Sequence, residues 1–367
     1  MKTYQSGKSN LLFIIIAIAA IAVGFLAQLS SSPDENAPEF EKTILLPQPK
    51  PLTMVPFKSH LDQPFNATDW LGRWSIVFYG FTNCPDVCPT TMQTLKQVKA
   101  ELVAAGVWQN YRVIMVSVDP QRDTTERLAQ YVPFFDSEFI GLRAESGATT
   151  EFAKQMGILF ISGEDSGDAN YDVDHSASII LIDPDARYAG VMTAPHKAET
   201  MVGDLIKLAK YRPAPVESMA TPNPASTEVN TVTKPLSFDV NAQDNAIQIS
   251  NAWIRPAPSS ARSMAAYLDI TNNSSKDIVF TSVEAEGFGM SMLHETVTEN
   301  DMTSMQHLDQ VSVPAGHTVH FAPMGKHIML MQPEEPLQLG EATQITLVTD
   351  DGQRISQRVE VRTPEIK

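Results

Sequence analysis

The chain has 367 residues, which is enough for two or three domains that each bury a core. Its formal net charge is −16 and it contains no arginine-rich run, which excludes a nucleic-acid-binding protein because phosphate recognition needs clustered positive charge. It has only two cysteines, Cys84 and Cys88, in one short loop, which excludes a fold held together by scattered disulfides.

The first 30 residues are predicted to form a cytoplasmic tip and a transmembrane anchor. An uncharged run from Leu11 to Leu29, if helical, nearly spans a hydrocarbon core of about 30 Å. Two lysines precede the run and acidic residues follow it, so we expect a single-pass protein of the inner membrane with its domains in the periplasm. A cleaved signal peptide is the alternative. In either case the thiols face an oxidising compartment, where they need a reductant or a bound metal.

Composition divides the remainder of the chain. Residues 31–51 are rich in Pro, Ser and acids and are predicted to be a spacer. Residues 52–211 and 246–362 carry apolar periodicity and are predicted to be two folded domains. Residues 212–245 contain many Pro, Ser and Thr and cannot bury a core, so they are predicted to be a linker.

The first domain alternates strand and helix patterns. A buried strand is predicted at 74–79, directly before the cysteines, and a helix at 91–104, directly after them. A strand followed by paired cysteines and a helix is typical of a thioredoxin-like α/β fold. The further expected elements are strands at 111–118, 178–182 and 188–192, and helices at 124–131, 149–156 and 198–210.

The second domain contains short strands between turn residues and few helical patterns. We expect an all-β sandwich or barrel of cupredoxin-like form. The predicted strands are 247–254, 263–271, 278–284, 317–321, 328–331 and 344–348.

The cysteine loop is a candidate site for a soft metal or for redox exchange. Cys84 and Cys88 lie at the start of a predicted helix, with Pro89 in its first turn, and the positive end of a helix lowers the pKa of a thiol. Two thiolates at this spacing can bind one ion if a third ligand comes from elsewhere, and His175 is the strongest candidate. Such a set suits Cu(I), or Cu(II) with a further ligand. A structural disulfide, half of a zinc site and a merely structural histidine are the alternatives.

Residues 79–91, 116–124 and 174–176 together resemble the Sco/SenC copper proteins of cytochrome oxidase assembly. The resemblance covers about residues 50–211. It implies a thioredoxin-like fold, copper binding by Cys84, Cys88 and His175, and delivery to the oxidase subunit that carries the CuA centre. Asp119 and Asp123 fall in a segment typical of the family, and we expect them to form hydrogen bonds within a loop rather than bind copper.

The second domain has a different soft-metal pattern. Because side chains alternate along a strand, His327 and Met329 point to the same face. With His294 and Met305 they offer imidazole and thioether ligands, which favour Cu(I) over zinc. The alternative is that the methionines only fill the core. His307, His317 and His320 are expected to be surface residues or to form a weaker Cu(II) site.

Residues 253–256, 265–268, 293–295 and 326–331, together with Met305, resemble the PCuAC family of periplasmic copper chaperones. The resemblance covers about residues 246–362 and implies that His294, Met305, His327 and Met329 bind copper. Met324 stands where family members often have glycine, so it is an additional or competing candidate ligand.

These observations predict a membrane-tethered copper chaperone with two sites. The expected partners are the oxidase subunit that carries CuA, other periplasmic copper carriers and thiol reductants. Two alternatives stay open. One is a thiol–disulfide oxidoreductase that acts through Cys84 and Cys88 on the cysteines of the oxidase, and the other is a copper-sensing or copper-sequestering protein.

Overall fold

The structure, a computed structural model, describes residues 38–162, 173–211, 246–299 and 302–363. The predicted anchor, residues 31–37 of the predicted spacer and the predicted linker at 212–245 lie outside these residues. The rest of the predicted spacer is described, and there the prediction is wrong, because residues 43–51 form a strand of the first domain. Among the helices that are described, none combines the length and the apolar character needed to cross a membrane. The described residues after Phe40 belong to one compact unit.

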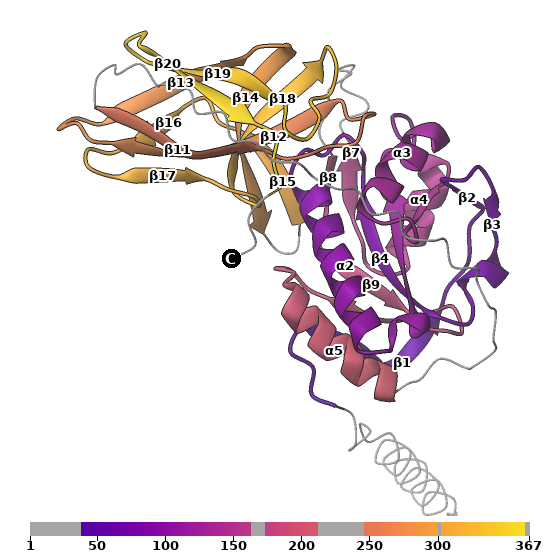
Figure 1. Ribbon diagram of the computed structural model, residues 1–367. Helices are drawn as coiled ribbons and strands as arrows, with labels where there is room; N and C mark the ends of the chain where they lie inside the picture. Colours follow the sequence, from indigo (N-terminus) through magenta and orange to yellow (C-terminus); the bar gives the residue numbers. More distant parts are fainter. Residues whose placement is uncertain (1–37, 163–172, 212–245, 300–301, 364–367) are drawn as a thin grey trace, which may run out of the picture. The chain divides into compact units, whose positions relative to one another are not determined.

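The first domain is built on a central sheet with the strand order β1-β10-β9-β4-β5-β6-β2-β3. Its middle strands β4 (Trp74–Gly80) and β5 (Tyr111–Ser117) are parallel and fully buried, which explains their nearly continuous apolar sequence. Helices α2 (Val87–Ala104) and α5 (Ala198–Tyr211) lie side by side, and α3 (Thr125–Phe135) packs against β6 (Figure 1). The other elements of this domain are β1 (Thr43–Pro51), β2 (Phe57–Ser59), β3 (Pro64–Phe65), β6 (Ile140–Arg143), α4 (Ser146–Lys154), β9 (Ile179–Ile182) and β10 (Arg187–Met192).

The expected thioredoxin-like α/β arrangement is confirmed. The predicted strands and helices fall on β4, α2, β5, α3, α4, β9, β10 and α5. Strands β1, β2, β3 and β6 are not predicted from the sequence, and β1 lies in the segment predicted to be a spacer. Several of these are short or contain proline, and β1 and β3 are the edge strands of the sheet, so their apolar pattern is weak.

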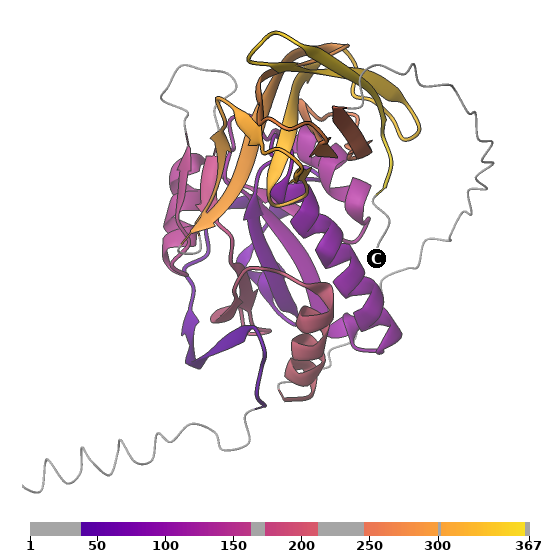
Figure 2. The same ribbon diagram turned by 90° about the vertical axis from the view of Figure 1, so that its left-hand side faces the viewer.

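The second domain consists of two sheets around one apolar core and is coloured orange to yellow in Figures 1 and 2. One sheet contains β11 (Ile247–Ile254), β12 (Ser263–Asn272), β14 (Phe288–Glu299), β15 (Met302–His307), β17 (Thr318–Phe321) and β18 (Lys326–Pro333). The other contains β13 (Ile278–Ala285), β16 (Val311–Val313), β19 (Ala342–Thr349) and β20 (Arg354–Glu360). Leu293, Ile328 and Leu330 from the first sheet and Phe280 and Leu347 from the second share the core. The β-rich second domain is therefore as expected.

The sheet that contains β14 and β15 continues into the first domain. Strand β8 (Val173–Ser176) pairs with β15, and β7 (Phe160–Ser162) pairs with β8. The register places His175 opposite Thr303 and Ser176 opposite Met302. An edge strand such as β15 exposes unpaired backbone groups, and β8 satisfies them. The sequence pattern does not predict this pairing.

Candidate metal sites

The cysteine loop connects the end of β4 to the start of α2. Cys84 and Cys88 are both buried and both free thiols, and the backbone N–H of Cys88 donates to the Cys84 sulfur at 3.4 Å. Burial raises the pKa of Cys84, but hydrogen bonds from Cys88 and from the backbone of Asp86 outweigh it, so this pKa lies below its usual value. Burial and the neighbouring Cys84 raise the pKa of Cys88. Cys84 is therefore the more readily ionised thiol of the pair.

His175 faces the loop from β8. Its Nε2 lies 3.8 Å from the Cys88 sulfur, and its Nδ1 lies 3.0 Å from the carbonyl oxygen of Ser176. A carbonyl oxygen only accepts, so Nδ1 carries the proton and the lone pair of Nε2 faces Cys88. Burial lowers the pKa of His175, which favours this neutral form. The structure thus brings His175 into contact with Cys88, whose backbone N–H in turn contacts Cys84.

Asp123 connects Thr82, at the start of the cysteine loop, to Ser117 at the end of β5. The carboxylate of Asp123 accepts from the hydroxyl of Thr82 at 2.6 Å, from the backbone N–H of Thr82 at 3.1 Å and from the hydroxyl of Ser117 at 2.7 Å. Burial raises the pKa of Asp123 to about 6, although these hydrogen bonds act in the opposite direction. Asp119 forms an ion pair with Arg122. The predicted hydrogen-bonding roles of both aspartates are confirmed.

The four candidate ligands of the second domain share one face of its sheet. His294 on β14 lies directly opposite His327 on β18. Met305 lies opposite Thr296, and Met329 opposite Met292. Side chains directly opposite each other, or two residues apart on one strand, point to the same side. The alternate positions, which include Leu293 and Ile328, face the core instead. Met329 is therefore on the candidate-site face rather than in the core between the two sheets, although it is buried.

The imidazoles of His294 and His327 each have one nitrogen that is available to bind a metal ion. The rings of His294 and His327 lie 5.9 Å apart between centroids and nearly perpendicular, at 84°, and both residues are buried. Nδ1 of His327 donates to the carbonyl oxygen of Gly325 at 3.0 Å. Nε2 of His327 and Nδ1 of His294 find no hydrogen-bond partner among the described residues. Burial lowers the pKa of His294 to about 4, and the charges of His327 and His307 add to this effect.

An unpartnered polar atom in a protein interior costs free energy unless a ligand satisfies it. Neutral imidazole nitrogens beside a thioether-bearing face are suitable donors for a soft ion. Considering only His, Cys, Asp and Glu, the part of the chain that the structure describes contains no group of three or more arranged to hold one metal ion. Cys84, Cys88 and His175 therefore do not form a closed three-ligand set in this structure, in which the contact to His175 comes from Cys88. Methionine is not among these residue types, so this finding does not apply to the His/Met set.

The other three candidate histidines, His307, His317 and His320, are exposed, which agrees with the expectation that they are surface residues. His307 is exposed and its ring lies 5.5 Å from that of His294, so it borders the candidate site. His320 pairs with Asp269 at 2.7 Å on β17, and His317 contacts the carbonyl oxygen of Ala315. The side chain of Met324 is partly exposed.

Comparison with known proteins agrees with the division into two domains. Residues 48–210 match the family model described as SCO1/SenC. A protein of Stutzerimonas stutzeri that is named for copper binding is 31% identical over 156 residues, which are 42% of this chain and 76% of that protein. The chain belongs to the SCO1/SenC family. The human mitochondrial SCO1 homolog is 32% identical to it over 171 residues, which are 46% of this chain but only 57% of the human protein.

Residues 247–361 match a second family model, described as an LpqE-like lipoprotein. This part is the domain whose sequence resembles the PCuAC family, and it is called the PCuAC-type domain. Among solved structures, Arabidopsis thaliana ScoI with copper bound is 24% identical, with a TM-score of 0.41, and the match covers 45% of this chain and 99% of that one. The copper-bound PCuAC domain from PmoF2 is 20% identical, with a TM-score of 0.29, and the match covers 34% and 97%.

The cysteine loop of the SCO1/SenC domain contacts the PCuAC-type domain through Asp86, which lies between the two cysteines. Its fully buried carboxylate accepts hydrogen bonds from the hydroxyl of Tyr267 at 2.8 Å, from the hydroxyl of Thr296 at 2.7 Å and from the backbone N–H of Met324 at 2.9 Å. Arg255 donates to the carbonyl oxygen of Asp86 at 2.9 Å. Asp86 is not among the residues predicted from the sequence, in which its position between the two cysteines is its one distinguishing feature.

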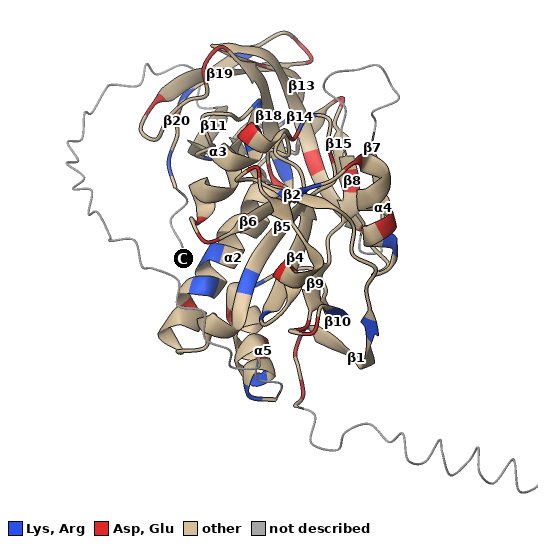
Figure 3. Cartoon of the chain, turned by 90° about the vertical axis from the view of Figure 1, so that its right-hand side faces the viewer, with Lys and Arg blue, Asp and Glu red and all other residues tan. Residues whose placement is uncertain are grey.

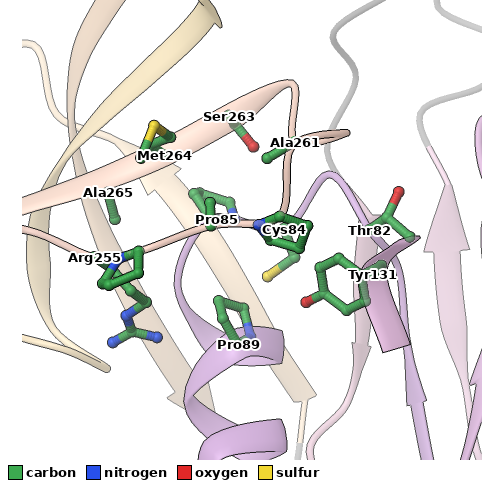
Figure 4. Close-up of a pocket in the computed structure, with 13 residues that line it drawn as sticks. Thr82, Cys84, Pro85, Pro89, Tyr131, Arg255, Ala261, Ser263, Met264 and Ala265 are labelled. Atoms are coloured by element: carbon green, nitrogen blue, oxygen red, sulfur yellow. The ribbon is translucent and has the colours of Figure 1, made fainter. Parts of the chain in front are cut away.

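The register of the shared sheet also joins the two candidate sites. Thr303 is two residues from Met305, so His175, which lies opposite Thr303, shares the face of the candidate ligands His294 and His327. Residues from both domains line a small pocket at the cysteine loop. In Figure 4 the sulfur of Cys84 lies between the rings of Pro89 and Tyr131.

Figure 3 shows how the charged residues are distributed. In the described elements that it presents, Lys and Arg are scattered among Asp and Glu.

Proposed function

We propose that the protein is a membrane-anchored periplasmic copper chaperone that binds Cu(I) at two sites. The cysteine site consists of Cys84, Cys88 and His175. The His/Met site consists of His294, Met305, His327 and Met329. The proposed anchor is residues 1–30 in the inner membrane, and residues 212–245 are the proposed linker between the domains. The proposed cargo acceptor is the subunit of cytochrome c oxidase that carries CuA.

One observation carries the proposal: the lone pair of His175 Nε2 faces the sulfur of Cys88. A thiol and a neutral imidazole that point at each other in a buried loop, with a second thiol four residues away, form a soft donor set. Cu(I) accepts a low number of such ligands. The names of the relatives, which include human mitochondrial SCO1 homolog and a protein named for copper binding, support copper as the cargo.

The His/Met site is supported by the unpartnered nitrogens of His294 and His327. Thioether sulfur is uncharged and has no proton to lose, so a site rich in methionine holds Cu(I) without competing protonation of the sulfur. Such a site suits an oxidising compartment, in which a free thiol is readily consumed.

Copper stoichiometry tests the two sites. The full-length protein, reduced and anaerobic, is expected to retain two Cu(I) ions. The double variant Cys84→Ser/Cys88→Ser and the double variant His294→Ala/His327→Ala are each expected to retain one. X-ray absorption on the first variant should show nitrogen and thioether ligands without thiolate. The variant His320→Ala is the control and should retain two ions. A wild type without bound copper would refute the proposal, and one with clearly more than two ions would favour sequestration.

A second candidate function is disulfide reduction of the oxidase cysteines. The hydrogen bond from the Cys88 backbone to the Cys84 sulfur stabilises a thiolate at Cys84, as an attacking thiol requires. Cys84 would attack the partner disulfide to form a mixed disulfide, and Cys88 would then attack Cys84, which releases the reduced partner and leaves Cys84–Cys88 oxidised.

The variant His175→Ala separates the two functions, because a carrier needs the imidazole and a dithiol reductase does not. The carrier is expected to lose copper at the cysteine site and to fail in oxidase maturation. If the variant still reduces a disulfide and still supports an active oxidase, the carrier role of this site is wrong and the reductase role is favoured.

A further inference from the structure

Asp86 occupies a position in which aspartate normally caps a helix. It precedes the first residue of α2, and an N-cap aspartate usually accepts a hydrogen bond from the backbone of the first turn. The side chain of Asp86 makes no such bond. Its carboxylate is instead completely buried and accepts hydrogen bonds from donors in the PCuAC-type domain. The usual helix-capping role therefore does not explain this residue.

A short chain of contacts leads from Asp86 to His327. One carboxylate oxygen, Oδ2, accepts from the Thr296 hydroxyl at 2.7 Å and from the Met324 backbone at 2.9 Å. Met324 has a φ of 64°, a left-handed conformation that is unfavourable for a residue other than glycine. The hydrogen bond to Asp86 holds this turn in place.

The turn at Met324 orients the imidazole of His327. The carbonyl oxygen of Gly325, the residue after Met324, accepts from the backbone N–H of Thr296 at 3.0 Å and from Nδ1 of His327 at 3.0 Å. This second bond places the proton on Nδ1 of His327. It leaves Nε2 with a lone pair that is free to bind a metal ion. Asp86 Oδ2 itself lies 3.9 Å from Nδ1 of His327.

We propose that Asp86, from the loop between the cysteines, is a positioning residue for the His/Met site and fixes the tautomer and orientation of His327. The inference rests on the proposed function of that site. Because Asp86 lies within the loop that carries Cys84 and Cys88, the conformation of the cysteine loop and the Cu(I) affinity of the His/Met site are linked.

Substitutions at both ends of the Asp86–Thr296 bond test the proposal. Thr296→Val removes the hydroxyl with little change in shape. Asp86→Asn replaces one carboxylate oxygen by an amide NH2 group, which donates hydrogen bonds. This group would face other donors, either the two on Oδ2 or the Tyr267 hydroxyl, so the hydrogen bonds at that oxygen are lost. The matched control is Thr298→Val, two residues further along β14. Within the described part of the chain, the hydroxyl of Thr298 forms a hydrogen bond only with the hydroxyl of Thr303.

Two measurements are made on the full-length chain. In the Cys84→Ser/Cys88→Ser background, Cu(I) affinity of the His/Met site is measured by competition with a chelator of known affinity. Thr296→Val and Asp86→Asn are each expected to weaken it at least ten-fold, and Thr298→Val to leave it unchanged. On the copper-free chain, ¹⁵N chemical shifts of the His327 ring report its tautomer. The Nδ1–H form should dominate in the parent and in Thr298→Val, and should lose its dominance in the other two variants.

The outcomes separate this inference from the proposed function. If the background chain binds Cu(I) and all three variants match it in affinity and tautomer, Asp86 is only a structural contact and the inference is wrong. If the background chain retains no Cu(I), the proposed His/Met site fails, and the tautomer measurement still decides whether Asp86 positions His327. Far-ultraviolet circular dichroism establishes that each variant is folded.

Discussion

The hydroxyl of Thr296 donates a 2.7 Å hydrogen bond to the carboxylate of Asp86, although 210 residues separate them in sequence. Thr296 lies two residues from His294 on the same strand face, and Asp86 lies two residues from both Cys84 and Cys88. One buried hydrogen bond thus connects the surroundings of the two candidate sites. A hydrogen bond to a buried charged group is stronger than a neutral one, and its loss leaves the charge less well satisfied.

Tyr267→Phe is expected to destabilise the protein by about 1.5–3 kcal/mol, because it removes a hydrogen bond to the buried carboxylate of Asp86. Chemical denaturation of the copper-free protein measures this loss. Tyr131→Phe is the matched control. The Tyr131 hydroxyl is buried without a hydrogen-bond partner among the described residues, so its removal is expected to be neutral or slightly stabilising. Equal effects of the two substitutions would contradict the importance of the Asp86 contact.

Arg255→Met is expected to cost about 3–5 kcal/mol. Arg255 is largely buried, donates to Thr90 and to the backbone of Asp86, and lies 3.6 Å from the carboxylate of Asp86. The substitution removes the cation beside this buried carboxylate, and breaking a buried ion pair from one side is strongly destabilising. Arg354→Met removes an exposed ion pair with Glu284 and is expected to cost far less, because water and salt screen an exposed pair. The same denaturation experiment compares them, and a small loss for Arg255→Met would show that the buried pair is dispensable.

Gly80→Ala is expected to displace the Cys88 side chain and to weaken copper binding at the cysteine site. A Cβ at this position would lie 2.6 Å from the ring of Phe78 and 3.0 Å from the Cys88 sulfur, and both neighbours are buried. Overpacking of this kind costs about 1–3 kcal/mol. Gly203→Ala is the control, because a Cβ there meets no atom within 4 Å, and in helix α5 alanine is favoured by about 1 kcal/mol. A copper stoichiometry of two in Gly80→Ala, with unchanged affinity, would contradict the prediction.

Asp123 is expected to make stability fall as pH rises from about 4 to about 7. Burial raises its pKa from 3.8 to about 6 in the folded protein, so between these values the folded chain still holds a proton that the unfolded chain has released. The folded state therefore binds more protons, and its stability decreases with increasing pH across this window. At about 1.4 kcal/mol per pKa unit, the effect is at most about 3 kcal/mol.

The measurement compares unfolding free energies of the wild type and Asp123→Asn at several pH values. Asparagine does not titrate, so the difference between variant and wild type should shift in favour of the variant as pH rises, by up to about 3 kcal/mol. Other groups titrate in the same window, but their contributions cancel in this difference. A difference independent of pH would show that Asp123 is ionised throughout.

Much of the cysteine site could be predicted from local sequence. The buried strand before Cys84 and the helix after Cys88 have clear apolar patterns, and the structure places β4 and α2 there. The strand that carries His294 was not predicted. In β14 one face packs in the core while the other carries methionine, histidine and threonine toward the candidate site, so the alternation of apolar and solvent-facing residues on which strand prediction depends is absent.

The sequence by itself determined the soft chemistry of this protein: two thiols in one loop, an imidazole and a thioether alternating at His327 and Met329, and two folded regions. These features are local, because the spacing along a strand or at a helix start decides which way neighbouring side chains point. Only the tertiary structure decided that β8 joins the sheet of the second domain beside β15 and that Asp86 contacts Tyr267 and Thr296. Such contacts join residues far apart in the chain, and they depend on which buried donors and strand edges remain to be satisfied when the domains pack.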